Sequence, residues 1–216
     1  MRFPDRFTAG RLLAQQLAGY ANNPDVVVLA LPRGGVPVGF EVARALNVPL
    51  DIIVVRKLGV PDHEELAMGA IASGDVRVLN HDTIDWLQIP SFVIERVTEM
   101  ERTELQRREL TYRGTAPPLD PTGKTVILVD DGIATGSTMR AAVAVVRSRG
   151  PQHVVIAVPT APVSTTKELG NVADDIVSVI TPDAFVGVGQ WYDDFRQVSD
   201  EVTRDLYECA KRWTMK

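Results

Sequence analysis

Five short runs of consecutive apolar residues, rich in valine and isoleucine, constrain the fold of this chain more than any other feature. The runs are Val26–Leu31, Ile52–Val55, Val126–Val129, Val154–Val158 and Ile176–Ile180. Continuous rather than alternating hydrophobicity is typical of strands covered on both faces of a parallel sheet. Predicted helices over Val36–Leu46 and Gly136–Arg149 follow the first and third runs, and this alternation predicts an α/β fold with a doubly wound parallel sheet. Ligands of such sheets usually bind in the loops after the carboxyl ends of the strands.

A different pattern occupies residues His81–Arg113, between the second and third apolar runs. Its second part, Ser91–Arg113, is dense in Glu and Arg, and Glu104 is spaced to pair with Arg108 on a helix. Gly114 follows as a natural helix end. We therefore expect an inserted helical segment, about residues 81–113, within a single domain that spans residues 1–216. Its charge run is interpreted as a solvated face rather than a binding surface.

Composition excludes several classes of protein. The 216 residues are 45% hydrophobic and 24% charged, which fits one globular domain. The net charge of −5 argues against a protein that coats nucleic acid. The single cysteine, Cys209, is spaced with Val202 and Leu206 on an expected apolar helix stripe, which predicts core packing. No apolar run has the pattern of a leader or a membrane span, so we expect a cytoplasmic protein without a membrane partner.

The segment from Val126 to Thr138 joins a buried strand, two adjacent carboxylates and a loop of small residues that opens into a helix. The amides of a tight loop and a helix N-terminus suit a phosphate group. Glycines let the backbone approach a ligand closely, and hydroxyl side chains add donors. The carboxylates of Asp130 and Asp131 can accept hydrogen bonds from sugar hydroxyls. The segment therefore predicts a site for a sugar phosphate.

This segment resembles the binding signature for phosphoribosyl pyrophosphate (PRPP) of the type I phosphoribosyltransferases. The resemblance implies that family's fold, with a small C-terminal hood, and a homodimer that binds PRPP, a nitrogenous base and Mg²⁺. Asp130 and Asp131 would contact the ribose hydroxyls, directly or through Mg²⁺, and Ala134–Thr138 would surround the 5′-phosphate. The PRPP-binding residues implied in this way are Asp130, Asp131, Gly132, Ile133, Ala134, Thr135, Gly136, Ser137 and Thr138.

A second loop follows the first apolar run and consists of Pro32, Arg33, Gly34 and Gly35. Paired glycines permit unusual backbone angles, and the guanidinium of Arg33 suits phosphate oxygens. Arg33-Gly34 resembles the Arg-Gly of adenine phosphoribosyltransferases. The resemblance implies a pyrophosphate-binding loop, in which the family often has a non-proline cis peptide bond.

Arg56 and Lys57 follow the second apolar run and could meet a diphosphate. Family members have a mobile catalytic loop that begins near such an Arg-Lys pair, and its closure would exclude water. His63, Glu64 and Glu65 could supply a proton acceptor, although a solvated loop explains them equally well.

An aromatic-rich, glycine-punctuated segment, residues 182–195, lies between the last strand and the last helix. Its opening resembles the base-recognition segment of hypoxanthine-guanine phosphoribosyltransferases, which implies that Phe185 stacks on a base and Val186 reads its edge. Trp191 and Tyr192 are weaker candidates. Those enzymes have an Asp in the PRPP loop where this chain has Ala134. A purine is thus one option, and the acceptor base stays unassigned.

The expected reaction is transfer of 5-phosphoribosyl from PRPP to a ring nitrogen with release of pyrophosphate. Arg33, Arg56, Lys57 and Asp131 would form the catalytic set and act by positioning and electrostatics. The alternative from another class is a non-catalytic PRPP or nucleotide sensor, because a fold does not guarantee activity.

Overall fold

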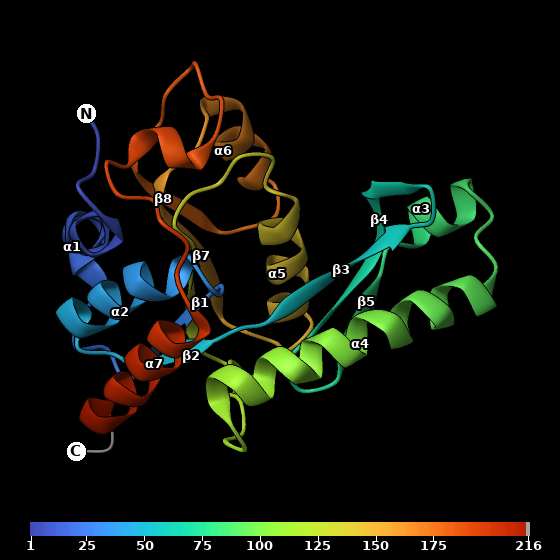
Figure 1. The fold of residues 1–216 in the computed structure, drawn as a ribbon, viewed down its shortest axis with the longest axis horizontal. Helices are drawn as coiled ribbons and strands as arrows, with labels where there is room; N and C mark the ends of the chain where they lie inside the picture. Colours follow the sequence, from blue (N-terminus) through green and yellow to red (C-terminus); the bar gives the residue numbers. More distant parts are fainter. Residues whose placement is uncertain (215–216) are drawn as a thin grey trace.

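The computed structural model describes residues 1–214, without the side chains of Glu64, Glu65 and Thr214. Its centre is a five-stranded parallel sheet in the order β2-β1-β6-β7-β8 (Figure 1). The strands are β1 (Val26–Ala30), β2 (Leu50–Ile52), β6 (Thr125–Val129), β7 (His153–Thr160) and β8 (Asp175–Ile180). Each strand overlaps one of the five apolar runs, which confirms the predicted parallel sheet.

Helices cover both faces of this sheet, as a doubly wound fold requires (Figure 1). Val26 and Val28 of β1 point into one core with α2, whereas Val27 and Leu29 point into a second core with α5. The first core is closed by α1 (Arg6–Gln16), α2 (Gly35–Leu46) and α7 (Asp200–Thr214), and the second by α5 (Ser137–Arg147) and α6 (Val163–Leu169). Because successive side chains of a strand alternate between faces, every residue of β1 is buried.

A second, antiparallel sheet stands beside the first in the order β3-β4-β5. It consists of β3 (Val55–Val60), β4 (His63–Ala72) and β5 (Val76–Leu79), and it leads into α3 (His81–Trp86) and α4 (Ser91–Arg113). The prediction of one strand over Ile52–Val55 was wrong. The Ile53 amide still donates to Ala30 of the parallel sheet at 3.0 Å, but the Val54 amide donates to the Ser73 hydroxyl of the antiparallel unit at 3.3 Å. The chain therefore changes sheets between these two residues.

Helix α4 has the predicted bounds, and Gly114 ends it in a backbone conformation with φ of 63°. The Glu104–Arg108 ion pair is present at 2.7 Å. The helix is less solvated than expected, because Ile94, Val97 and Leu105 are buried. Its last residue, Arg113, forms an ion pair with Asp51 of β2 at 3.1 Å, and both side chains are only 3% exposed. The helix is thus anchored to the parallel sheet at its C-terminal end.

The assignment of Cys209 to the core was also wrong, since this side chain is exposed. Helix α7 instead buries Thr203, Tyr207 and Ala210, a stripe that is rotated from the expected one by a single residue. Among the described residues, no helix is both long and apolar enough to cross a membrane. The remaining short helices are η1 (Ala18–Tyr20) and η2 (Val188–Trp191).

Candidate active site

The loop between β6 and α5 forms a cradle at the carboxyl edge of the parallel sheet. The Ile133 amide donates to the Thr160 carbonyl at 2.9 Å, and the Thr165 hydroxyl donates to the Ala134 carbonyl at 2.8 Å. Gly136 has a φ of 76°, which side-chain-bearing residues rarely adopt, and it immediately precedes α5. The loop, together with Asp130 and Val188, lines a cavity of about 240 Å³. Because the first amides of a helix have no acceptor within it, this cavity suits a phosphate.

Asp130 and Asp131 stand side by side at the end of β6. The Asp131 amide donates to the Asp130 carboxylate at 2.8 Å. Burial, reinforced by the neighbouring Asp131 charge, raises the pKa of Asp130 well above its ordinary value. Burial also raises the pKa of Asp131, against the opposing effect of the Arg6 guanidinium. Two buried, adjacent carboxyl groups are more readily ionised together when a cation or hydroxyl donors bind beside them.

The predicted pyrophosphate loop lies directly against these carboxylates. The Pro32–Arg33 peptide bond is cis, in agreement with the family expectation. A methyl group on Gly34 would lie 2.0 Å from an Asp131 carboxylate oxygen, and one on Gly35 would lie 2.7 Å from the Val129 carbonyl oxygen. The two loops predicted to bind opposite ends of PRPP are therefore in contact, and glycine is what permits this approach.

Arg33 itself points toward α7. Its guanidinium pairs with Asp200 at 3.4 Å, and the Tyr112 hydroxyl donates to the same Asp200 oxygen at 2.9 Å. Arg33 does not belong to the residues that line the cavities beside Asp130. The structure thus brings the backbone of the predicted loop to the site but holds its cationic side chain in an ion pair.

Arg6 is a site residue that the sequence analysis missed. Its guanidinium forms an ion pair with Asp131 at 2.8 Å, and the two side chains are 10% and 13% exposed. It also donates to the Arg196 carbonyl at 2.9 Å and lies 4.0 Å from the centre of the Phe195 ring. One signal was available: Asp5 caps α1, so Arg6 stands in the first turn, where the helix dipole disfavours a cation without an acidic partner.

Arg56 and Lys57 were expected at the end of a strand, but they lie near the start of β3, which continues to Val60, so that prediction was wrong about the local structure. Both line a cavity of about 640 Å³, which they share with Pro32, Asp130 and Thr138. The structure therefore brings together residues from the three predicted segments. Arg56 forms an ion pair with Glu101 of α4 at 2.6 Å. His63 begins β4 beside the hairpin turn, is exposed and is not part of this cavity, and the side chains of Glu64 and Glu65 lie outside the described ones.

The predicted base-binding residues lie on the outer part of the segment that covers this edge. Val186 is 94% exposed, and the Phe185 ring stacks on Trp191 at 6.2 Å. Val188 lies closer to the site, because it contacts Gly132 and lines the phosphate-sized cavity. Tyr192 is buried and donates its hydroxyl to the Asp131 carbonyl at 2.5 Å. Phe185 and Val186 therefore remain predictions as base contacts.

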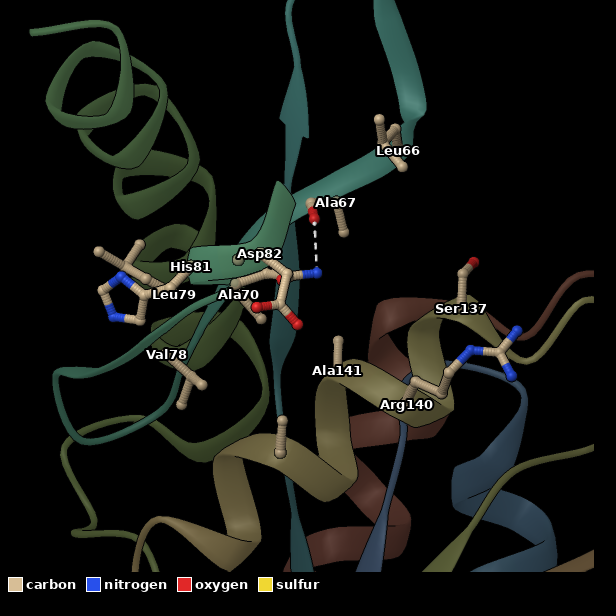
Figure 2. Close-up of a pocket in the computed structure, with 13 residues that line it drawn as sticks. Leu66, Ala67, Ala70, Val78, Leu79, His81, Asp82, Ser137, Arg140 and Ala141 are labelled. Atoms are coloured by element: carbon tan, nitrogen blue, oxygen red, sulfur yellow. Dashed lines mark hydrogen bonds between the residues drawn. The ribbon is translucent and has the colours of Figure 1, made fainter. Parts of the chain in front are cut away.

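A further cavity, of about 670 Å³, lies between the antiparallel sheet and α5. Figure 2 shows Leu66, Ala70 and Val78 on one side and Ala141 and Arg140 of α5 on the other. Arg140 donates to the Thr135 carbonyl at 2.7 Å and so also supports the phosphate loop. Of the residues predicted to bind PRPP, this cavity includes Ser137.

A parallel sheet whose Asp-Asp loop meets both a helix N-terminus and a glycine-paired loop defines the class of type I phosphoribosyltransferase folds. The chain belongs to the phosphoribosyltransferase family, since the phosphoribosyl transferase domain of that family matches residues 3–196. The resemblance and the fold class inferred from the sequence are thereby confirmed.

Individual relatives extend this result. A Mycobacterium tuberculosis protein, provisionally named a phosphoribosyl transferase, is 47% identical over 210 residues, which are 97% of this chain and 47% of that protein. The chain thus spans about half the length of the curated relatives it matches. The crystal structure of TT1426 from Thermus thermophilus is 41% identical, with a TM-score of 0.88 over 96% of this chain and 98% of that one. The bifunctional protein PyrR of Chloroflexus aurantiacus is 36% identical over 50% of this chain and 53% of its own length.

Proposed function

We propose that this protein transfers the 5-phosphoribosyl group of PRPP to a nitrogenous base and releases pyrophosphate. The observation that carries the proposal is the contact between the two loops, residues 32–35 and 130–138. The loop of residues 130–138 offers amides for a terminal phosphate, and the loop of residues 32–35 lies against Asp130 and Asp131. A ligand with a phosphate at one end, a diphosphate at the other and hydroxyls between them fits this order of groups.

The site residues would act in two ways: some would bind PRPP, and others would stabilise the negative charge on the departing pyrophosphate. The amides and hydroxyls of Ala134–Thr138 would hold the 5′-phosphate, and Asp130 and Asp131 would accept hydrogen bonds from the ribose hydroxyls. As the C1–O bond to pyrophosphate breaks and the bond from C1 to the base nitrogen forms, negative charge grows on the leaving group. Arg56 and Lys57 line the cavity in which that charge would develop. Arg33 would join them only after exchanging Asp200 for the ligand.

Mg²⁺ fits the carboxylate pair as a cation that arrives with the substrate. Asp130 and Asp131 offer the oxygen ligands that Mg²⁺ prefers, and their raised pKa values indicate a place where a cation is favourable. Among the described residues, no group of three His, Cys, Asp or Glu side chains could hold a metal alone. Mg²⁺ commonly takes one or two carboxylates plus substrate phosphates, and it would neutralise charge on the diphosphate.

The first test is a calorimetric titration with PRPP, with and without Mg²⁺. We expect Mg²⁺-dependent binding that Asp130→Asn weakens by about 10- to 100-fold, because a charged hydrogen-bond acceptor is lost. Asp131→Asn should weaken it as well, with its thermal unfolding measured in parallel because Arg6 loses its partner. A folded wild-type protein that binds no PRPP would contradict the proposal.

A non-catalytic PRPP or nucleotide sensor is the second candidate. It is favoured by one observation: three of the four predicted catalytic side chains form ion pairs within the protein, Arg33 with Asp200, Arg56 with Glu101 and Asp131 with Arg6. Incubation with PRPP and a panel of purine and pyrimidine bases separates the two candidates. Release of pyrophosphate from PRPP in the presence of one base supports the transferase. PRPP binding without pyrophosphate release in the presence of any base supports the sensor. A homodimer and a cytoplasmic location remain predictions.

A further inference from the structure

Helix α4 contributes to the cavity beside Asp130, although its charge run suggested a solvated face. Arg96, Met100, Glu101 and Arg108 of α4 line this cavity opposite Arg56 and Lys57 of β3. On a helix these four positions lie on neighbouring faces, so the contact runs along several turns. The cavity volume of about 640 Å³ leaves space for a multiply charged ligand between the helix and the strand.

Among the described side chains that line this space, cations outnumber acids. Its lining includes four cationic side chains, Arg56, Lys57, Arg96 and Arg108, against the two acidic side chains Asp130 and Glu101. Arg96 is exposed and has no ion pair with any described side chain. Arg108 pairs with Glu104, but Glu104 is shared with Arg107, so two guanidiniums face one carboxylate. An excess of positive charge held between two rigid elements favours an anion.

We propose that α4 belongs to the substrate site: Arg96 and Arg108 bind a diphosphate, and Glu101 restrains Arg56 until that diphosphate displaces it. This inference rests on the proposed function, because the diphosphate is the leaving-group end of PRPP. Glu101 and Arg56 are 21% and 29% exposed and lie 2.6 Å apart. A bound diphosphate would compete with Glu101 for the same guanidinium, so Glu101 opposes binding through both its charge and its hydrogen bond.

Arginines on two different sides of α4 provide a test variant and a matched control. Arg102 also lies on α4, but it pairs with Glu99 and lines a different cavity with Leu105 and Glu109. Arg102→Gln therefore removes the same charge from the same helix without touching the proposed subsite. Arg96→Gln/Arg108→Gln removes two subsite cations, and Glu101→Gln removes the competitor while keeping the side-chain size.

Inorganic pyrophosphate and ribose 5-phosphate are titrated separately into the wild type and these variants by calorimetry. We expect Arg96→Gln/Arg108→Gln to weaken pyrophosphate binding by about tenfold or more, because charge-assisted hydrogen bonds are lost. Glu101→Gln should strengthen it, and Arg102→Gln should match the wild type. Ribose 5-phosphate, whose phosphate would occupy the loop Ala134–Thr138, should bind all four proteins equally.

Failure of this inference differs from failure of the proposed function. If the double variant binds pyrophosphate as tightly as Arg102→Gln, α4 is not part of the site, whatever the protein does with PRPP. If Glu101→Gln weakens pyrophosphate binding, the competing role of Glu101 is wrong. Suppose that only the double variant shows weakened pyrophosphate binding, and that the wild type releases no pyrophosphate from PRPP with any base. The assignment of α4 to a diphosphate subsite is then supported, and the proposed transfer reaction is contradicted.

Discussion

Gly34→Ala is expected to lower PRPP affinity by about 100-fold, because the added methyl group costs roughly 2–3 kcal/mol where it meets Asp131. The backbone at Gly34 is helical, with φ of −60° and ψ of −35°, so alanine is allowed there on conformational grounds. The cost arises from contact, since the methyl group would lie 2.0 Å from the Asp131 oxygen. Asp131 has little room to move, because it is 13% exposed and paired with Arg6.

Gly19→Ala is the matched control for this prediction. A methyl group at Gly19 would meet nothing within 4 Å. PRPP titration of both variants and the wild type checks the prediction, and a thermal unfolding curve shows whether Gly34→Ala is folded. Equal affinity of a folded Gly34→Ala protein would show that the approach of the two loops does not govern binding.

Arg113→Met is expected to lower the free energy of unfolding by about 3–5 kcal/mol, because it leaves the buried Asp51 charge without its partner. Asp51 and Arg113 are each 3% exposed in their side chains and lie 3.1 Å apart. Arg113 also donates to the Ile52 carbonyl, and Asp51 accepts from the Leu119 amide at 2.8 Å. One ion pair thus joins β2, the end of α4 and the segment that returns to the sheet.

Thermal unfolding measures this loss, and about 10 °C is the expected fall in Tm for a chain of this size. Arg102→Met is the control on the same helix, since its pair with Glu99 is exposed and such pairs contribute at most about 1 kcal/mol. Asp51→Asn/Arg113→Met should recover part of the stability, because no isolated charge then remains. A fall for Arg113→Met no larger than that for Arg102→Met would mean that the buried pair contributes little.

Local pattern predicted most of the fold. Continuous apolar runs located the parallel strands, and the Asp-Asp loop with its flanking strand and helix located the cradle, because these features depend on neighbours in sequence. The change of sheet after Ile53 escaped prediction, since it depends on Ser73, which is distant in the chain. The error at Cys209 has a different origin: a helix stripe identified by spacing alone is uncertain by one residue when its partner surface is unknown.

The site was predicted where it lies within one loop and missed where two distant segments meet. Arg6 and Asp131 are 125 positions apart, and no periodicity in the sequence connects them. The role of α4 was misjudged for a similar reason. Glu and Arg at helical spacing form ion pairs both on a solvated helix face and around a cavity. The sequence does not show that Arg96 lines the cavity next to β3 whereas Arg102 lines a different one.

Residues 3–6 and residues 192–196 pack together around Asp131, and this contact has a consequence for the order of folding. Phe3 pairs with Tyr192 in an isolated parallel bridge, and Arg6 donates to the Arg196 carbonyl across 190 positions. A chain is synthesised from its N-terminus, and contacts between distant residues form late. The contacts of Phe3 and Arg6 with residues 192–196 can therefore form only after that later segment has been synthesised. The carboxylates at the end of β6 acquire their final surroundings only when these distant contacts have formed, so ligand binding would report formation of the contacts rather than formation of the sheet alone.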